Sequence, residues 1–168
     1  NKVRGLSPDG RGARVASISV WRRRGSAYPY IDPLADAGIN VDMIVQNVGH
    51  GGTTDMSFTV PRAELGKARK VLDGVVRELG ARDLTTDASV GKVSIVGAGL
   101  HNAPGYAARM FGALAAAKVN IEMISTSEVR ITCIVAEHDL EAAVRALHAA
   151  FELATADPVD APATGTGG

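Results

Sequence analysis

The sequence predicts an α+β protein in which one βαββαβ unit occurs twice in tandem. Three observations support this fold class. Residues 39–44 (INVDMI) return 80 positions later as residues 119–124 (VNIEMI). A glycine-centred loop precedes each copy, and its glycines, Gly25 and Gly105, are also 80 positions apart. Finally, both copies show the same order of strand-like alternation and helical spacing of apolar residues.

The first strand of each unit is predicted from alternation. In residues 15–20, Ala16, Ile18 and Val20 fall on one face of a strand. Residues 92–96 (KVSIV) occupy the equivalent place in the second copy. We therefore expect each sheet to contain one such strand directly before the glycine loop.

The helix after the glycine loop is predicted to differ between the copies. In the second copy an apolar stripe is unbroken and consists of Met110, Phe111, Leu114 and Ala117. In the first copy Pro29 and Pro33 interrupt the equivalent segment, and an interior proline costs a helix about 3 kcal/mol. We expect this helix to begin late, with Asp32 as its N-cap and Pro33 at its first helical position.

The second half of each unit is predicted to be a hairpin followed by a closing helix. Residues 49–52 (GHGG) mark the hairpin before a strand at residues 54–60, and residues 130–135 form the equivalent strand. Apolar positions at helical spacing mark the closing helices, namely Leu65, Ala68, Leu72, Val75 and Leu79 before the C-cap candidate Gly80, and Leu140, Ala143, Val144, Leu147 and Phe151. Residues 83–86 supply a fourth strand to the first copy, and a chain terminus supplies one to the second.

The domain boundaries follow from these elements. The predicted domains span residues 13–88 and 89–155, with terminal strands drawn from residues 1–12 and 156–168. A chain of 168 residues is long enough for two such small domains. Residues 156–168 are rich in Pro, Gly, Ala and Thr, a composition that is typical of a frayed end.

Composition excludes some classes of partner. The formal net charge is zero at pH 7 and 46% of the residues are apolar, so electrostatics offers no attraction to nucleic acid or to an anionic membrane. No run of about 18 apolar residues occurs, and the start of the chain lacks the apolar segment of a secretory signal. We expect a cytoplasmic protein whose partner is a small molecule or another protein.

Reactive side chains are few. Cys133 lies in the apolar run 131–135 and is predicted to be a buried, inert thiol. The four histidines, His50, His101, His138 and His148, share no metal-ligand spacing, so no metal site is expected. No Ser-His-Asp, Cys-His or paired-carboxylate pattern emerges, and we therefore predict no catalytic residues.

Three features allow competing interpretations. Residues 97–102 (GAGLHN) resemble a dinucleotide-binding fingerprint, but Asn102 replaces its third glycine, which favours a simple tight turn. Residues 22–24 (RRR) could contact a phosphate or an anionic surface, although a short charge run is usually a solvated loop. Met43 and Met123 occupy equivalent strand positions and are assigned to the core instead of a ligand pocket.

Four long strings of residues carry a resemblance to a known family. They are residues 40–48 (NVDMIVQNV), 52–59 (GTTDMSFT), 90–100 (VGKVSIVGAGL) and 119–131 (VNIEMISTSEVRI). Together they resemble the regulatory region of aspartate kinase, which consists of tandem ACT domains and in actinobacteria also exists as a separate β subunit. The resemblance covers essentially the whole chain.

This resemblance implies a fold and a function. The fold would be two ferredoxin-like ACT domains in tandem that share sheets across a homodimer. The function would be feedback inhibition of aspartate kinase by threonine and/or lysine, in the aspartate-family amino-acid pathway, without a cofactor. The implied partner is the aspartate kinase catalytic domain or α subunit. Because that kinase domain has no counterpart here, we expect this chain alone not to be an enzyme.

The resemblance also implies two effector sites, each formed where a loop of one ACT domain faces a strand of another. The first would consist of Arg22, Gly25, Ser26, Ala27 and Gln46, facing Asn120 and Ile121. The second would consist of Ala103, Pro104, Gly105, Tyr106 and Ala107, facing Asn40, Val41 and Asp42, with Ser127 nearby. Backbone N–H groups at a helix start suit an amino-acid carboxylate, and its ammonium group requires carboxylate or carbonyl acceptors.

The first site departs from the family pattern. The family usually has Asp-x-Pro-Gly where residues 22–25 read RRRG, so a base replaces the acid that would accept the effector's ammonium group. The resulting repulsion costs about a kcal/mol or more. The second loop also varies, since Ala107 stands where the family commonly has a hydroxyl residue. This leaves an alternative function, a structural dimerisation module with a degenerate first effector site that gives a feedback-relaxed aspartate kinase. A third hypothesis, an ACT-fold enzyme, is disfavoured by the missing catalytic residues.

Overall fold

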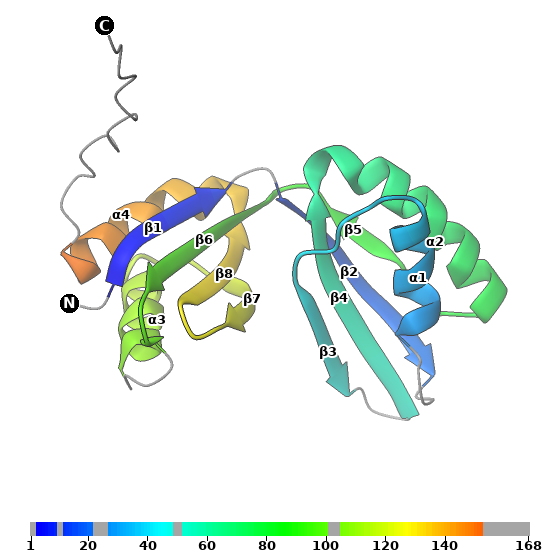
Figure 1. Ribbon diagram of the computed structural model, residues 1–168, viewed down its shortest axis with the longest axis horizontal. Coiled ribbons are helices and arrows are strands. Elements are labelled where there is room, and N and C mark those ends of the chain that lie inside the picture. Colours follow the sequence, from blue (N-terminus) through cyan, green and yellow to red (C-terminus); the bar gives the residue numbers. More distant parts are fainter. Residues whose placement is uncertain (1–2, 10–11, 22–26, 49–51, 101–104, 153–168) are drawn as a thin grey trace, which may run out of the picture.

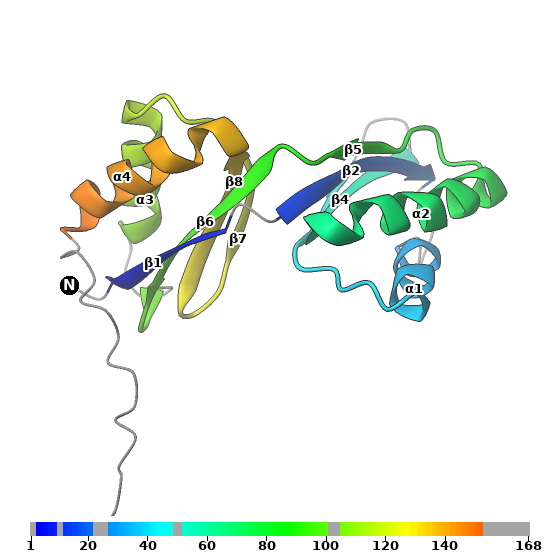
Figure 2. The same ribbon diagram turned by 90° about the horizontal axis from the view of Figure 1, so that it is seen from above.

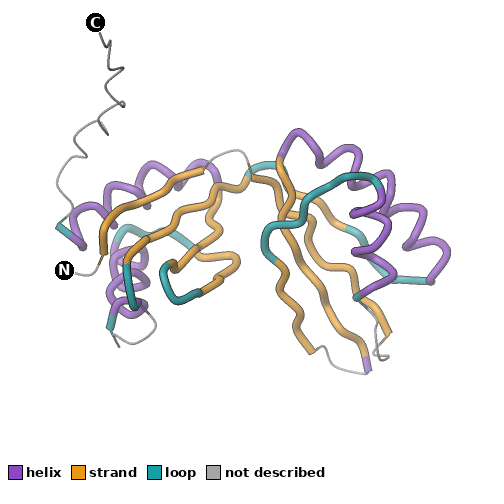
Figure 3. The backbone as a smooth tube through the Cα atoms, viewed as in Figure 1, coloured by secondary structure: helices purple, strands orange, loops and turns teal. Residues whose placement is uncertain are grey.

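The computed structural model describes residues 3–9, 12–21, 27–48, 52–100 and 105–152. These residues form two four-stranded antiparallel sheets, each with two α-helices. The sheets lie next to each other in Figure 1, and the view from above in Figure 2 shows their helices on opposite sides of the molecule. The predicted α+β, ferredoxin-like architecture is confirmed, as the alternation of helices and strands along the tube in Figure 3 shows.

The first unit, as we call the sheet β3-β4-β2-β5 and its helices, follows the predicted order of elements. Its elements are β2 (Gly12–Trp21), α1 (Tyr28–Asp36), β3 (Ile44–Val48), β4 (Thr53–Pro61), the 3-10 turn η2 (Arg62–Glu64), α2 (Leu65–Leu79) and β5 (Thr85–Asp87). Strand β5 is the fourth strand expected from the residues that follow α2. Gly80 ends α2 with a left-handed φ of 67°, which confirms the prediction that this glycine is the C-cap.

The second unit, the sheet β1-β6-β8-β7 and its helices, takes one strand from the start of the chain. Its elements are β1 (Val3–Asp9), β6 (Val90–Gly97), α3 (Tyr106–Ala116), β7 (Ile121–Thr126), β8 (Arg130–Ala136), the 3-10 turn η4 (Glu137–Asp139) and α4 (Leu140–Phe151). Strand β1 pairs antiparallel with β6, so the chain crosses from the second sheet to the first and then returns. Residues 156–168, the other predicted source of a terminal strand, lie outside the described residues.

Each unit has its own apolar core between its sheet and its helices. Buried residues of the first core are Tyr30, Leu34, Ile39, Met56, Phe58, Val60, Ala68 and Leu72. Those of the second core are Val93, Ile95, Leu100, Met110, Leu114, Val119, Ile131, Cys133, Val135, Ala143, Leu147 and Phe151. Burying one large apolar side chain contributes about 1.5–3 kcal/mol, so these two clusters stabilise the units separately.

Helix α1 begins earlier than the sequence predicts. The expected late start with Asp32 as the N-cap is wrong, because the helix spans Tyr28–Asp36 with Ala27 at the N-cap position. Pro29 lies in its first turn, where a backbone N–H would have no partner within the helix. The carbonyl of Ala27 already accepts the N–H of Tyr30 at 3.1 Å. A proline in this position therefore does not delay the helix.

Pro33 remains inside α1, where it does remove a hydrogen bond. It cannot donate to the carbonyl of Pro29, four residues earlier. Tyr30 and Leu34 are buried in the first core, and their burial offsets the local cost. Tertiary contacts thus override a propensity that, taken alone, predicts a shorter helix.

The repeated strings begin their strands at different positions. The repeat predicts strands over both, but β3 begins only at Ile44 whereas β7 begins at Ile121. Just before β3 the backbone still bonds to β4, because Asp42 N–H donates to the carbonyl of Thr59 and Thr59 N–H donates to the carbonyl of Met43, each at 3.0 Å. The buried hydroxyl of Thr59 additionally accepts the N–H of Met43 at 3.0 Å, so the pairing there is irregular. Ile134 has the equivalent place opposite β7 and carries no hydroxyl.

Cys133 is confirmed as a buried thiol. It lies on β8 in the second core with no exposed surface. Burial raises the pKa of the thiol to about 12, because the charged thiolate would be desolvated. A thiol with that pKa is inert at neutral pH.

Neither a membrane-spanning helix nor a metal-binding cluster occurs in the part of the chain that the structure describes. No helix there is long and apolar enough to span a bilayer. No group of three or more His, Cys, Asp or Glu side chains in the same residues is placed to hold a metal ion.

Candidate functional site

The two units meet at a small apolar cluster, which we call the seam. Met43 of the first unit clusters there with Val90, Met123 and Ile134 of the second, and the partly buried Val45 packs against them. The two repeated methionines are buried, as predicted. Their cluster, however, joins the two units and does not belong to the core of either one.

Two ion pairs also join the units. Asp42 Oδ2 of the first unit lies 2.7 Å from Lys92 Nζ of the second. Arg62 Nη1 of the first unit lies 2.9 Å from Glu137 Oε1 of the second, and Arg62 Nη2 donates to the carbonyl of Val90 at 3.3 Å. Because partly exposed ion pairs contribute only about 0–1 kcal/mol each, they orient the units more than they hold them together.

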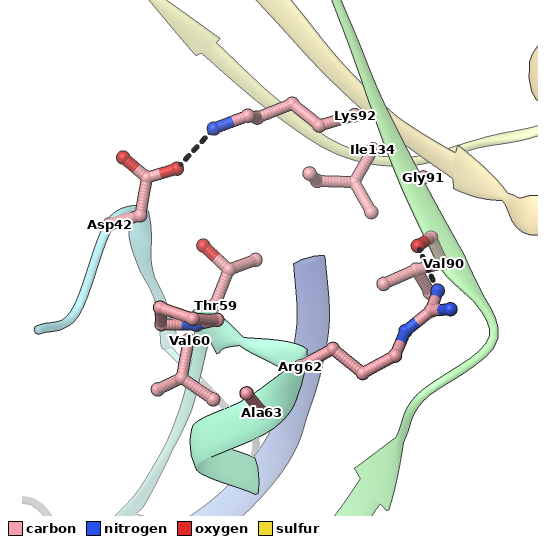
Figure 4. A pocket seen from close by; sticks show the side chains of 10 residues that line it. Asp42, Thr59, Val60, Arg62, Ala63, Val90, Gly91, Lys92 and Ile134 are labelled. Carbon is pink, nitrogen blue, oxygen red and sulfur yellow. Dashed lines mark hydrogen bonds and ion pairs between the residues drawn. The ribbon is translucent and has the colours of Figure 1, made fainter. Parts of the chain in front are cut away.

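A cleft of about 720 Å³ lies between these ion pairs, and we call it the apolar cleft. Figure 4 shows Asp42 and Lys92 on one side of it and Arg62 across from them. Its lining residues are Asp42, Thr59, Val60, Pro61, Arg62, Ala63, Val90, Gly91, Lys92 and Ile134. Within the described residues, Arg62 Nε is buried without a hydrogen-bond partner. The cleft therefore combines apolar walls with charged groups at its two ends.

A second hollow, which we call the polar hollow, has a volume of about 180 Å³ and contains the same Asp42–Lys92 pair. Its lining residues are Asp42, Met43, Lys92, Ser125, Thr126, Ser127, Arg130 and Thr132. In the described part of the chain, the Arg130 guanidinium and the Ser125 and Thr126 hydroxyls have no protein partner. These groups offer hydrogen-bond donors for a carboxylate, while Asp42 offers an acceptor for an ammonium group.

Two residues expected in the second effector site meet in the polar hollow, namely Asp42 and Ser127. The others that the structure describes do not line it. Tyr106 and Ala107 pack against the second core, and Tyr106 stacks on Phe151 with ring centroids 6.2 Å apart. Gly105 is the exposed N-cap of α3 with a φ of 107°.

Two of the remaining second-site residues, Asn40 and Val41, do not line the hollow. Asn40 is exposed and Val41 packs against the first core. Ala103 and Pro104 lie outside the described residues.

The first predicted site is described only in part. Arg22, Gly25 and Ser26 lie outside the described residues. The four others lie at the N-cap of α1, on β3 and at the start of β7, and are Ala27, Gln46, Asn120 and Ile121. None of these four lines the apolar cleft or the polar hollow.

Sequence reasoning missed Lys92, Arg130 and Thr132 as site residues. One signal was present, since Lys92 is the only charged residue in β6, whose other side chains are apolar or small. Arg130 likewise begins the otherwise uncharged β8. A charged residue in such a strand marks a sheet face that is not buried under a helix. Its partner could not be inferred, because Asp42 is 50 residues away in the sequence.

The fold is the mixed α/β, ferredoxin-like fold of ACT domains. A family model described as an ACT domain matches residues 93–151, which lie in the second unit.

Relatives of known identity extend the match to both units. The aspartate kinase of Stutzerimonas stutzeri is 49% identical over 154 residues, covering 92% of this chain and 36% of the relative. The aspartokinase of Corynebacterium glutamicum is 42% identical, covering 91% and 37%. The chain thus spans only 36–37% of the length of these curated relatives.

A solved structure matches this chain over almost its whole length. The regulatory subunit of aspartate kinase from Thermus thermophilus, in its ligand-free form, is 40% identical with a TM-score of 0.86, and the match covers 90% of this chain and 99% of that chain. The chain described here belongs to the family of aspartate kinase regulatory regions.

Proposed function

We propose that this chain binds threonine and/or lysine as an effector and thereby mediates feedback inhibition of an aspartate kinase catalytic domain or α subunit. Its own role is regulatory, without a cofactor, and catalysis belongs to that partner. The observation that carries the proposal is the polar hollow, in which Asp42 of the first unit and Arg130 of the second face one space. The affinity for a ligand that binds both residues would depend on the relative placement of the two units.

The chemistry of the polar hollow suits a free amino acid. The ammonium group would donate to the Asp42 carboxylate, and the carboxylate would accept from the Arg130 guanidinium. The hydroxyls of Ser125 and Thr126 remain for the effector's side chain. A volume of about 180 Å³ is smaller than the roughly 300–1,000 Å³ of pockets for drug-sized ligands, which favours a ligand as small as one amino acid.

We also propose a homodimer, which two exposed isoleucines support. Ile44 on β3 is 52% exposed and Ile124 on β7 is 43% exposed, and each of these strands lies at the edge of its sheet. They occupy equivalent places in the two copies of the repeat. Exposed apolar edge strands tend to pair with another chain, so a second copy that covers both edges would bury these side chains.

The alternative function is a dimerisation module whose first effector site no longer binds. It is favoured by the Arg22–Arg24 triplet in the sequence and by the fact that none of the four described first-site residues lines either hollow. Such a region would hold kinase chains together and leave their activity relaxed toward feedback.

Isothermal titration with threonine and then with lysine tests the proposal, with the oligomeric mass measured by light scattering at the same concentrations. We expect a dimer and saturable binding of at least one of the two amino acids. Asp42→Asn and Arg130→Gln should each weaken that binding about 10- to 100-fold, because each removes a charge-assisted hydrogen bond.

Arg145→Gln is the matched control, since Arg145 is an exposed arginine of α4 that pairs with Glu141. This variant should bind as the wild type does. A well-folded dimer that gives no heat with either amino acid would support the dimerisation module instead. A kinase assay of this chain alone checks its non-catalytic role.

A further inference from the structure

The Asp42–Lys92 ion pair stands between the two hollows and belongs to both. The two residues line the apolar cleft and the polar hollow alike, and their charged atoms are 2.7 Å apart. The Lys92 side chain is only 24% exposed, whereas that of Asp42 is 55% exposed. An ammonium group of the protein therefore already occupies the carboxylate that an effector's ammonium group requires.

We propose that Lys92 is a built-in competitor of the effector for Asp42, so that effector binding breaks the Asp42–Lys92 pair and changes the placement of the two units. This inference rests on the proposed function, because it takes Asp42 as the effector's ammonium acceptor. It makes Lys92 a residue that sets effector affinity and that connects the site to the arrangement of the units.

Charge balance in the two hollows favours competition over sharing. Among the described residues that line either hollow, Asp42 is the only acidic one, whereas Lys92, Arg130 and Arg62 are basic. A bound ammonium group next to Lys92 would place two positive charges within a few ångströms at a partly buried position, where water screens them incompletely. The arrival of one cation thus favours the departure of the other.

Loss of this pair would act on the relation between the units because its two residues belong to different units. Asp42 precedes β3 of the first unit, and Lys92 lies on β6 of the second. Without it, the seam around Met43 and the Arg62–Glu137 pair at 2.9 Å would remain. The seam is small and apolar, so it does not fix the orientation of the units through directional bonds.

Titration of two variants tests the competition. Lys92→Met removes the competitor and keeps an unbranched side chain of similar length, so it should bind the effector amino acid about 3- to 10-fold more tightly than the wild type. Glu137→Gln removes the other ion pair between the units without changing any residue that lines the polar hollow, and should change the affinity by less than about twofold.

Either of two results would overturn the competition. The first is unchanged or weaker binding by Lys92→Met, which would make Lys92 neutral or a direct ligand of the effector. The second is an equal gain in both variants, which would show that any loosening of the units suffices. If the wild type binds neither amino acid, the proposed function fails. Binding by Lys92→Met in that case would still support the competition. Absence of binding by both proteins would overturn the proposed function and the competition together.

A distance measurement tests the structural consequence. Spin labels at Lys70→Cys on α2 and Ala149→Cys on α4 report on the separation of the units, because both positions are exposed and the native Cys133 is buried. Labelled protein is diluted with unlabelled protein so that only distances within one chain are read. We expect saturating effector to shift the wild-type distribution toward that of Lys92→Met without ligand. An identical distribution in all states would contradict the proposal.

Discussion

Cys133 illustrates how burial alone determines the chemistry of a residue. Its thiol has no exposed surface, and its pKa is raised to about 12 because the surrounding second core cannot solvate a thiolate. In the unfolded chain the same thiol would ionise near 9.0. Its state of protonation is therefore linked to folding.

This linkage gives a pH dependence with a definite sign. Between about pH 9 and 12 the unfolded chain has lost the Cys133 proton while the folded protein keeps it. The unfolded state then binds fewer protons, so the free energy of unfolding falls as the pH rises, by up to about 1.4 kcal/mol per pH unit. Cys133→Ala removes this contribution. Urea unfolding of both proteins at pH 8, 9 and 10 measures it.

Other groups titrate in the same range, so the difference between the two proteins is the informative quantity. It should be constant below pH 9 and should then change in favour of the alanine variant. Parallel pH profiles for the two proteins over the whole range would contradict the linkage.

At the scale of an element, helix α1 shows how tertiary contacts compete with local helix propensity. It contains two prolines in nine residues, and both lie inside its bounds. They are not equivalent, because Pro29 lies in the first turn and Pro33 lies in the interior. Only the second removes a hydrogen bond that the helix would otherwise make.

Replacing each proline by alanine separates the two positions. Pro33→Ala restores an N–H that can donate to the carbonyl of Pro29, and should stabilise the protein by about 1–3 kcal/mol. The gain is reduced by up to about 1 kcal/mol because alanine leaves the unfolded chain more flexible. Pro29→Ala is the matched control and should change the stability little. Urea unfolding measures both, and equal effects would show that position within the helix does not matter.

Elements with one dominant signal could be predicted from the sequence. Helix α2 has both an apolar stripe and a C-terminal glycine, and Ala68 and Leu72 of its predicted face are buried, whereas Leu79 at its end is 44% exposed. The start of α1 could not, because the burial of Tyr30 outweighs the proline penalty only in the folded protein. The irregular pairing just before β3 likewise involves Thr59, which lies 16 residues from Met43 and which local periodicity does not reveal.

Less of the candidate site than of the fold could be predicted from the sequence, because the site also depends on tertiary contacts. Asp42 and Ser127 were inferred from a family resemblance, and both line the polar hollow. Lys92 and Arg130 could not be inferred as their neighbours, because the hollow forms where residues far apart in the sequence meet between two units. The periodicity of apolar residues within one element does not reveal which residues of the two units come into contact.

At the scale of the whole molecule, the chain start couples the two units. Strand β1 precedes the first unit in sequence but forms the edge of the second sheet, where it pairs with β6. Leu6 packs there against the second core. The second unit is therefore complete only when the chain that precedes the first unit returns to it. By contrast, the first unit draws all its strands from one continuous segment, 12–87.

Deleting residues 1–9 should accordingly weaken the second unit and leave the first intact. The deletion removes the backbone partners of β6 on one side and the contacts of the partly buried Leu6 with the second core. Full burial of a leucine side chain contributes about 1.5–3 kcal/mol, so the loss of Leu6 costs less than that. Hydrogen exchange read by mass spectrometry should show lost protection in β6 and α4, with α2 unchanged. Pro8→Ala is the control, because Pro8 is exposed and the strand remains, so its exchange should match that of the wild type.

The same deletion should reach the candidate site, since Asp9 of β1 lies opposite Lys92 in the register of the two strands. Without β1, the part of β6 that carries Lys92 becomes a free edge, and the Asp42–Lys92 pair loses one of its supports. Effector affinity in the shortened chain should therefore differ from that of the wild type even though every residue of the polar hollow is kept. Unchanged exchange in β6 would show that β1 is dispensable to the sheet, and the expected effect on binding would then lose its physical basis.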